Sequence, residues 1–143
     1  NIKEEILLYS KRLSHYTDFE LQEIPSLKSS TKISQSELKK NEGQMIMKYL
    51  NSNDYVVLLD ENGKSYSSID FSKKIEKFRL NSFKRVVFVV GGAFGFSDEL
   101  YSRCNEKVSL SNMTFSHQMV RLFFVEQLYR AFTIINNEKY HHQ

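Results

Sequence analysis

Two charged residues, Glu126 and Arg130, interrupt a long apolar segment near the C-terminal end of the sequence. They are four positions apart, so on a helix they share a face and can form an ion pair. In the alternative arrangement, Arg130 points into a pocket and binds a phosphate or a carbonyl oxygen through its planar guanidinium. The tail that follows contains Tyr140, His141 and His142, which on composition alone is consistent with a flexible end. The spacing leaves both roles of Arg130 open.

A glycine-rich loop, residues 91–95, follows an apolar segment and precedes a helix whose first turn contains Asp98 and Glu99. Glycines in such a loop allow a positive φ and a close approach to a ligand. The loop lacks both the GxGxxG pattern and the Lys-Ser/Thr of a phosphate loop. The two acidic residues would also repel a phosphate that the helix dipole attracts. We therefore expect Gly91 and Gly92 either to line a pocket for a ligand without phosphates or to form only a tight turn.

A row of small polar side chains precedes the last apolar segment: Ser109, Ser111, Asn112, Thr114 and Ser116. A loop of this kind can bind the edge of an adenine through its amides and carbonyls. Serine and threonine are also the residues that begin helices, so capping is the alternative. Capping accounts for one or two of the five positions, which favours a binding role for the rest.

Neither Cys104 nor His117 has partners at a spacing typical of a catalytic or metal site. We expect Cys104 to be a buried structural thiol, because no histidine or aspartate motif accompanies it. His117 is expected to act locally at the start of a helix, and no metal site is predicted.

Alternating helical and strand patterns must position these residues. Two short runs of apolar residues, 55–59 and 86–90, do not alternate in polarity and are typical of strands that are covered on both faces. The expected elements are helices at 2–16, 36–50, 68–79, after Ser97 and at 116–136, strands at 19–24, 55–59, 86–90 and 108–110, a loop at 26–35 and a turn at 60–64. In the first helix, Ile2, Ile6, Tyr9 and Leu13 form part of one apolar stripe.

This order of elements predicts one α/β domain, residues 1–143, with a mostly parallel sheet and helices on both faces. Ligands of such sheets bind beyond the carboxyl ends of the strands, which here places residues 59–60, 91–92 and 111–112 together. The last helix is apolar on all sides, so we expect a second subunit to cover part of it.

Composition narrows the class of protein further. The 143 residues are 41% apolar and 26% charged, which is ordinary for one globular domain. No apolar run approaches the roughly 18 residues of a membrane span. The net charge of +3 permits a polyanionic partner without requiring one. One cysteine excludes a disulfide within the chain and suggests a reducing, cytoplasmic location.

Five segments, taken in order, resemble the RlmH family of SPOUT methyltransferases, which modify a pseudouridine of large-subunit rRNA. They are residues 9–13, 89–95, 110–121, 126–131 and 140–141. Two departures from the family stand out. The strand ending in Val-Gly-Lys with which members begin is absent from this sequence, and Ser116 replaces the usual proline before His117.

The resemblance implies a C-terminal trefoil knot that binds S-adenosyl-L-methionine, in a homodimer whose active site includes residues of the partner. It also implies methyl transfer to N3 of a pseudouridine in 23S rRNA of the assembled ribosome. A base must take the N3 proton, and His141 or Glu126 is the candidate, with Arg130 and Tyr140 positioning the nucleotide. The residues expected at the cofactor are Leu59, Gly91, Gly92, Leu110, Ser111, Asn112, Met113, Thr114 and Phe115.

Two other functions compete with this hypothesis. The chain could be a non-catalytic RNA- or ribosome-binding module that uses only its basic surface. It could instead be an ordinary nucleotide-binding α/β protein, which the missing fingerprint and the acidic residues after the glycine loop disfavour.

Overall fold

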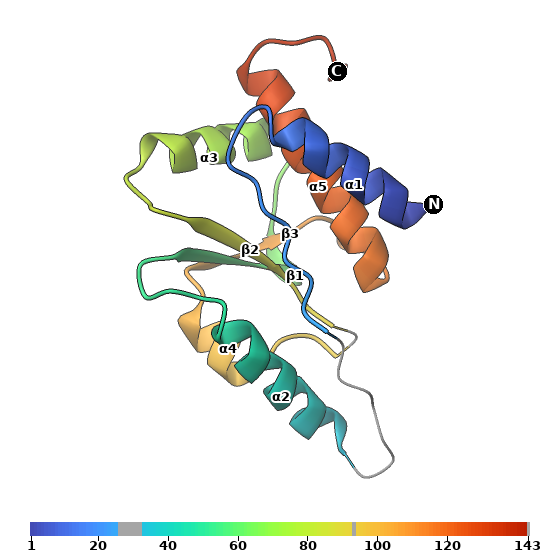
Figure 1. The fold of residues 1–143 in the computed structure, drawn as a ribbon, viewed down its shortest axis with the longest axis vertical. Helices are drawn as coiled ribbons and strands as arrows, with labels where there is room; N and C mark the ends of the chain where they lie inside the picture. Colours follow the sequence, from blue (N-terminus) through green and yellow to red (C-terminus); the bar gives the residue numbers. More distant parts are fainter. Residues whose placement is uncertain (26–32, 93, 143) are drawn as a thin grey trace.

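The computed structural model describes residues 1–25, 33–92 and 94–142. Within these ranges the chain forms a three-stranded sheet between two layers of helix (Figure 1). The helices are α1 (Ile2–Leu13), α2 (Gln35–Met47), α3 (Ser68–Leu80), α4 (Asp98–Arg103) and α5 (His117–Ile135), and the strands are β1 (Tyr55–Ser65), β2 (Val86–Val90) and β3 (Glu106–Ser109).

The sheet has the order β2-β1-β3, and both pairs of strands are parallel. Leu58 of β1 lies opposite Val89 of β2 on one side and opposite Lys107 of β3 on the other. The α/β class and the parallel sheet predicted from the sequence are therefore confirmed. The carboxyl ends of the three strands meet at one edge, where the glycine loop and the polar loop begin.

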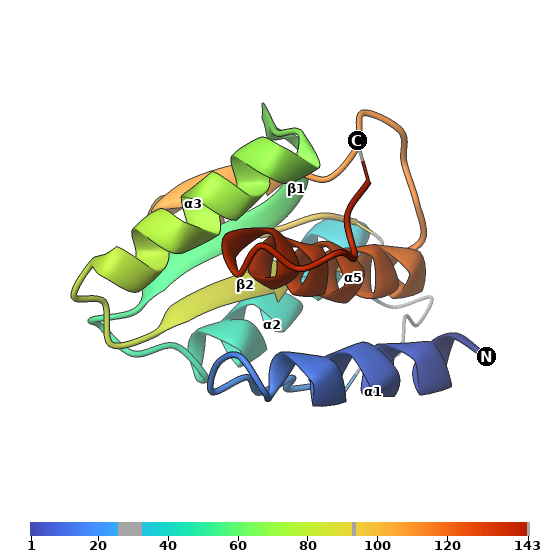
Figure 2. The same cartoon turned by 90° about the horizontal axis from the view of Figure 1, so that it is seen from above.

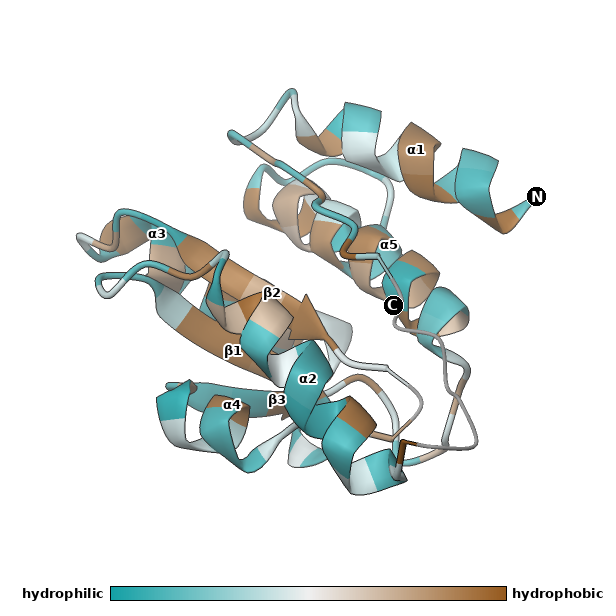
Figure 3. Cartoon of the chain, turned by 60° about the horizontal axis from the view of Figure 1, so that its bottom comes forward, coloured by the Kyte–Doolittle hydropathy of each residue, from teal (hydrophilic) through white to brown (hydrophobic). Residues whose placement is uncertain are grey.

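The two faces of β1 belong to two separate apolar cores. Val56 and Leu58 pack with Leu100 of α4 on the face that α2 and α4 cover. Val57 and Leu59 pack with residues of α1, α3 and α5 on the other face, which Figure 2 shows from above. Because successive side chains of a strand point to opposite faces, an uninterrupted apolar run is what such a covered strand requires. Figure 3 shows these apolar strands between the helices.

Two expectations about strands are wrong. Residues 19–24 form no strand, although Phe19 packs against the core. Alternating polarity reports which face is buried, whereas a strand also needs a neighbouring backbone with which to form hydrogen bonds. Residues 60–64 do not end β1, which continues to Ser65 with irregular pairing between Leu59 and Lys64. Gly63 is needed there, because an added Cβ would lie 2.6 Å from the carbonyl carbon of Lys107.

Serine hydroxyls begin four of the helices. Ser67, Ser97 and Ser116 accept hydrogen bonds from the backbone of the first turns of α3, α4 and α5. Capping therefore accounts for Ser116 among the small polar residues that precede the last helix. The helix expected at 36–50 begins at Gln35, because Ser34 is its cap.

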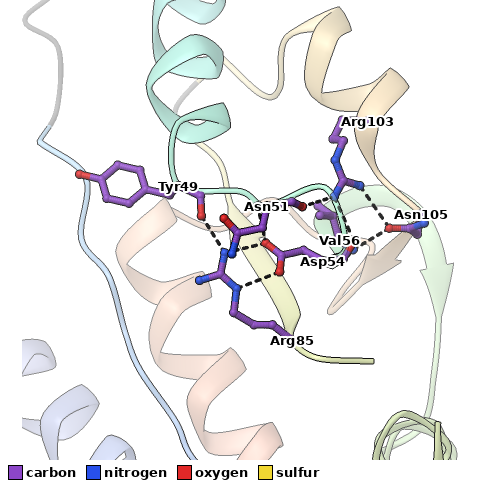
Figure 4. A network of polar contacts seen from close by, with 7 residues as sticks. All are labelled: Tyr49, Asn51, Asp54, Val56, Arg85, Arg103 and Asn105. Atoms are coloured by element: carbon purple, nitrogen blue, oxygen red, sulfur yellow. Dashed lines mark hydrogen bonds and ion pairs between the residues drawn. The ribbon is translucent and has the colours of Figure 1, made fainter. Parts of the chain in front are cut away.

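A polar network fixes the amino-terminal ends of the strands, away from the glycine loop (Figure 4). The buried carboxylate of Asp54 accepts hydrogen bonds from Nε and Nη2 of Arg85, at 3.0 and 2.6 Å. Arg103 donates to the Asp54 carbonyl oxygen, and Asn105 accepts from the backbone of Val56. The hydrogen bond from Arg85 lowers the pKa of Asp54, although burial acts in the opposite direction. The network therefore holds an ionised carboxylate inside the fold.

Candidate functional site

The C-terminal tail folds back onto α5 and brings Glu126, Arg130, Tyr140 and His141 together. Arg130 donates to Oε1 of Glu126 from Nη2 at 2.6 Å and from Nε at 3.1 Å. Its Nη1 lies 2.9 Å from Nδ1 of His141, and its guanidinium lies 4.9 Å from the centre of the Tyr140 ring. The four residues expected to be catalytic thus form one cluster, and the ion pair of Glu126 and Arg130 is present, whereas Arg130 lines neither of the two cavities described below.

Hydrogen-bond chemistry fixes the protonation of this cluster. Arginine has donors only, so Nδ1 of His141 must accept and the imidazole is neutral, with its proton on Nε2. The Tyr140 hydroxyl donates to Oε1 of Glu126 at 3.1 Å. Burial, the hydrogen bond with Tyr9 and the charge of Glu126 raise the pKa of Tyr140 above its ordinary value. Tyr140 is therefore a neutral donor across the physiological range.

A cavity of about 340 Å³ lies between the polar loop and α5. It is lined by Leu110, Ser111 and Phe115 from the group expected at the cofactor, and by Glu126 from the group expected to be catalytic. Tyr66, at the end of β1, lines another part of it. This volume lies within the usual range for small-molecule sites. The cavity therefore joins the two groups of residues that the sequence predicted separately.

The hydroxyls of the polar loop mostly bond within the loop or to its neighbours. Ser109 donates to the carbonyl oxygen of Ser111, and Ser111 accepts from the backbone of Met113 at 3.0 Å. Thr114 donates to the Glu61 carboxylate at 2.7 Å. Turn formation therefore accounts for more of these positions than capping alone, and it leaves backbone groups to face a ligand. Asn112 and Met113 are exposed at the tip of the loop.

The glycine loop makes a tight turn in which the Gly95 amide donates to the Gly92 carbonyl oxygen at 3.3 Å. Gly95 has a φ of 83°, so the need for a positive φ falls on this glycine and not on Gly91 or Gly92. An added Cβ at Gly91 would lie 3.0 Å from the Phe96 ring, so close packing explains that glycine. The structure therefore shows the tight turn that was one of the two alternatives for this loop, and such a turn does not exclude a role in ligand binding.

Six of the nine residues expected at the cofactor do not line the cavity: Leu59, Gly91, Gly92, Asn112, Met113 and Thr114. Leu59 is buried in the core, and Gly91 and Gly92 lie at the end of the neighbouring strand β2. An added Cβ at Gly92 would lie 2.6 Å from Oε2 of Glu42, a half-buried carboxylate of α2. Burial raises the pKa of Glu42, and the charge of His117 partly offsets this. No local pattern singles out Glu42, because it is one polar residue among several in an amphipathic helix.

The sequence also did not mark Tyr9 as a site residue, because its position in the apolar stripe of α1 already accounts for its ring. Its hydroxyl lies 3.2 Å from that of Tyr140. Two further polar contacts adjoin the cavity: Ser68 donates to Gln127 at 2.7 Å, and Gln127 donates to Glu126 at 3.0 Å. The contacts of Tyr9 with Tyr140 and of Ser68 with Gln127 join residues far apart in the sequence, so they leave no local pattern.

The remaining candidates have local roles. Cys104 is half-buried and donates to the Tyr101 carbonyl oxygen, and burial raises the pKa of its thiol. His117 and Arg121 line a second cavity of about 290 Å³, where Arg121 pairs with Glu23 at 2.9 Å. Among the residues that the structure describes, no group of histidine, cysteine and carboxylate side chains could hold a metal ion. In the same part of the chain, no helix has the length and apolar character of a membrane span.

Comparison with known proteins matches this chain to one family over nearly its whole length. A family model described as predicted SPOUT methyltransferase matches residues 1–141. A protein of Christiangramia forsetii is 54% identical over 138 residues, which is 96% of this chain and 88% of the relative. One from Flavobacterium psychrophilum is 50% identical over 143 residues, covering 100% of this chain and 91% of the relative. Both are named ribosomal RNA large subunit methyltransferase H.

Proposed function

This chain belongs to the SPOUT methyltransferase family, and we propose that it methylates N3 of a pseudouridine in 23S rRNA of the assembled ribosome. S-adenosylmethionine is the proposed methyl donor, and the cytoplasm is the proposed location. The observation that carries the proposal is the cavity that joins the polar loop to Glu126 of the C-terminal cluster. A methyltransferase needs a donor site and proton-handling groups within reach of one another.

The residues around the cavity fit this donor. Leu110 and Phe115 offer apolar surface for an adenine, and Ser111 adds a hydroxyl and backbone groups. The carboxylates nearest the two loops, Glu61 and Glu42, suit a ligand that is cationic and carries no phosphate. When bound, S-adenosylmethionine supplies an activated methyl group on a positively charged sulfur.

The C-terminal cluster would handle the substrate. N3 of pseudouridine is an imide nitrogen that keeps its proton near neutral pH, so a base must remove it. Glu126 already accepts from Arg130 and Tyr140 through one oxygen and from Gln127 through the other. We therefore assign the proton to Nδ1 of His141, which becomes free when Arg130 turns to a carbonyl oxygen of the nucleotide. A paired base is out of reach, so the target must lie in a loop or be flipped out.

We further propose a homodimer and a trefoil knot in one domain that spans residues 1–143. Leu7 and Leu8 of α1 are 65% and 41% exposed, and Met113 and Phe115 before α5 are 71% and 40% exposed. Exposed apolar side chains of this kind are typical of a surface that a second subunit covers. Residues of one protomer would then complete the site of the other.

Titration calorimetry with S-adenosylmethionine tests the proposed donor site. Gly92→Asp would put a second carboxylate against Glu42 and displace the loop, so we expect it to abolish binding while the protein stays folded. Ser82→Asp adds the same charge at an exposed position after α3 and should bind like the wild type. A wild-type protein that releases no heat at millimolar donor, yet still binds rRNA, would favour the non-catalytic RNA-binding module.

A further inference from the structure

The first helix reaches the C-terminal cluster through a single hydroxyl. Tyr9 of α1 is half-buried, and its hydroxyl lies 3.2 Å from that of Tyr140, 131 positions later in the chain. Figures 1 and 2 show α1 lying alongside α5, with which it shares the first apolar core. Tyr9 thus joins the start of the described chain to the residues proposed for proton handling.

The direction of this hydrogen bond follows from donor counting. A phenol has one proton, and the Tyr140 proton goes to the carboxylate of Glu126, which can only accept. Tyr9 must therefore donate to Tyr140 in the arrangement that the structure shows. The result is a directed chain of hydrogen bonds from Tyr9 through Tyr140 to Glu126, which in turn holds Arg130. Each bond in such a chain polarises the next one.

Aromatic contacts hold both phenols in place. The Tyr129 ring lies 5.7 Å from that of Tyr9 and 4.8 Å from that of Tyr140, centre to centre. Arg12 lies 5.5 Å from the centres of both the Tyr9 and Tyr129 rings. Because the rings are packed, loss of the Tyr9 hydroxyl should change the hydrogen bond with little change in packing.

We propose that Tyr9 is a positioning residue for methyl transfer: its hydroxyl orients Tyr140, and through it the Glu126–Arg130–His141 cluster. The inference rests on the proposed function. Without the Tyr9 donor, the Tyr140 oxygen loses a partner and the tail leaves its docked position more often.

A second tyrosine provides a matched control. The Tyr16 hydroxyl donates to the Glu138 carboxylate at 2.8 and 2.9 Å, so it also ties the N-terminal region to the tail. Glu138 is exposed and, within the described chain, its side chain forms no hydrogen bond or ion pair with the catalytic cluster. Tyr16→Phe therefore removes the same atom and one tether, but it leaves the hydrogen-bond chain to Glu126 intact.

The experiment compares Tyr9→Phe, Tyr16→Phe, Tyr140→Phe and the Tyr9/Tyr140 double variant. The first measurement is the single-turnover rate of methyl transfer to 23S rRNA, with the S-adenosylmethionine affinity from calorimetry. The second needs no activity: trypsin cleavage after Lys139, an exposed tail residue, reports how often the tail opens. Tyr9→Phe should slow methyl transfer about tenfold at unchanged donor affinity and speed cleavage, whereas Tyr16→Phe should leave the methyl-transfer rate unchanged.

The double variant distinguishes positioning through Tyr140 from general destabilisation. If Tyr9 acts through Tyr140, Tyr9→Phe adds nothing in the Tyr140→Phe background. The inference fails if Tyr9→Phe equals the wild type in both measurements, if Tyr16→Phe slows methyl transfer as much, or if the two effects simply multiply. A wild type without methyl transfer contradicts the proposed function instead, and the cleavage measurement then still tests the link between Tyr9 and Tyr140.

Discussion

At the scale of single residues, Arg130 organises the site because its guanidinium contacts three different groups. It bonds to Glu126 and His141 in its own plane and faces the Tyr140 ring. Arginine suits such a position because its donors form a rigid planar fork. One Nη1 donor of this fork bonds to Nδ1 of His141.

Replacing His141 with alanine tests its assigned role. We expect His141→Ala to slow methyl transfer about 100-fold, because alanine lacks the imidazole nitrogen that we propose as the acceptor of the N3 proton. The donor affinity should stay unchanged, since His141 does not line the cavity. The control is His142→Ala, the exposed neighbouring histidine, which should behave like the wild type. A fully active His141→Ala protein would remove His141 from the chemistry.

The sequence showed part of this cluster and could not show the rest. The spacing of Glu126 and Arg130 offered their ion pair as one of two alternatives, because helical neighbours are a local property. The roles of Tyr140 and His141 came from the family resemblance, since a tail has no periodicity that places it. Tyr9 was hidden because an apolar stripe explains its ring and says nothing about its hydroxyl.

At the scale of helices and strands, local sequence patterns predicted most elements. The exceptions depend on which neighbouring strands are available for backbone pairing. Residues 55–59 and 86–90 form neighbouring buried strands, as their uninterrupted apolar runs indicated. Residues 19–24 alternate in polarity but are not part of the sheet. β1 continues past its expected turn because β3 pairs with Lys64 and Ser65. The polarity pattern of a segment does not determine which strand its backbone pairs with.

Gly43 allows α2 and α4 to pack closely. An added Cβ would lie 2.2 Å from Oγ and 2.8 Å from Cβ of Ser97, the cap of α4. Alanine normally stabilises a helix relative to glycine by about 1 kcal/mol. Here we expect Gly43→Ala to lower the free energy of unfolding by about 1–3 kcal/mol, because the helices must separate. Urea denaturation measures the change, with Gln44→Ala on the exposed side of α2 as control. A stabilised Gly43→Ala protein would refute the close contact.

The network around Asp54 predicts a pH-dependent stability. The pKa of Asp54 is lower in the folded state than in the unfolded chain. The ionised carboxylate therefore stabilises the fold fully above the ordinary carboxyl pKa, about 3.9, and this stabilisation is lost as the pH falls through the lower pKa of the folded state. Asp54→Asn should therefore cost about 1–3 kcal/mol near neutral pH, and the cost should shrink below about pH 4. Urea denaturation at several pH values measures it, with the exposed Asp18→Asn as control. A constant difference between pH 7 and 3 would contradict this assignment.

At the scale of the whole molecule, the strands direct both loops proposed to bind the donor to one edge of the sheet, and α5 carries Glu126 and Arg130 of the proposed catalytic cluster. The opposite edge is fixed by the Asp54–Arg85 network (Figure 4). One end of the fold is therefore rigid, while the other presents an open cavity and a tail. This division is typical of sheets that bind ligands beyond the carboxyl ends of their strands.

The proposed homodimer predicts an effect of charge on α1. Leu7→Lys places a cation on the apolar surface that we expect a second subunit to cover, so the protein should dissociate at micromolar concentration. Sedimentation equilibrium measures the mass. Leu80→Lys is the control, because Leu80 is 79% exposed at the end of α3. A wild-type protein that is monomeric at all concentrations would rule out the dimer.

The most direct test of the account is the position of the methyl group on rRNA. Ribosomes without this modification are incubated with the protein and isotope-labelled S-adenosylmethionine, and the nucleosides of the large-subunit rRNA are separated by mass spectrometry. We predict label in one nucleoside, N3-methylpseudouridine, with none when Gly92→Asp replaces the wild type. Label in another nucleoside, or unlabelled rRNA despite measurable donor binding, would contradict it.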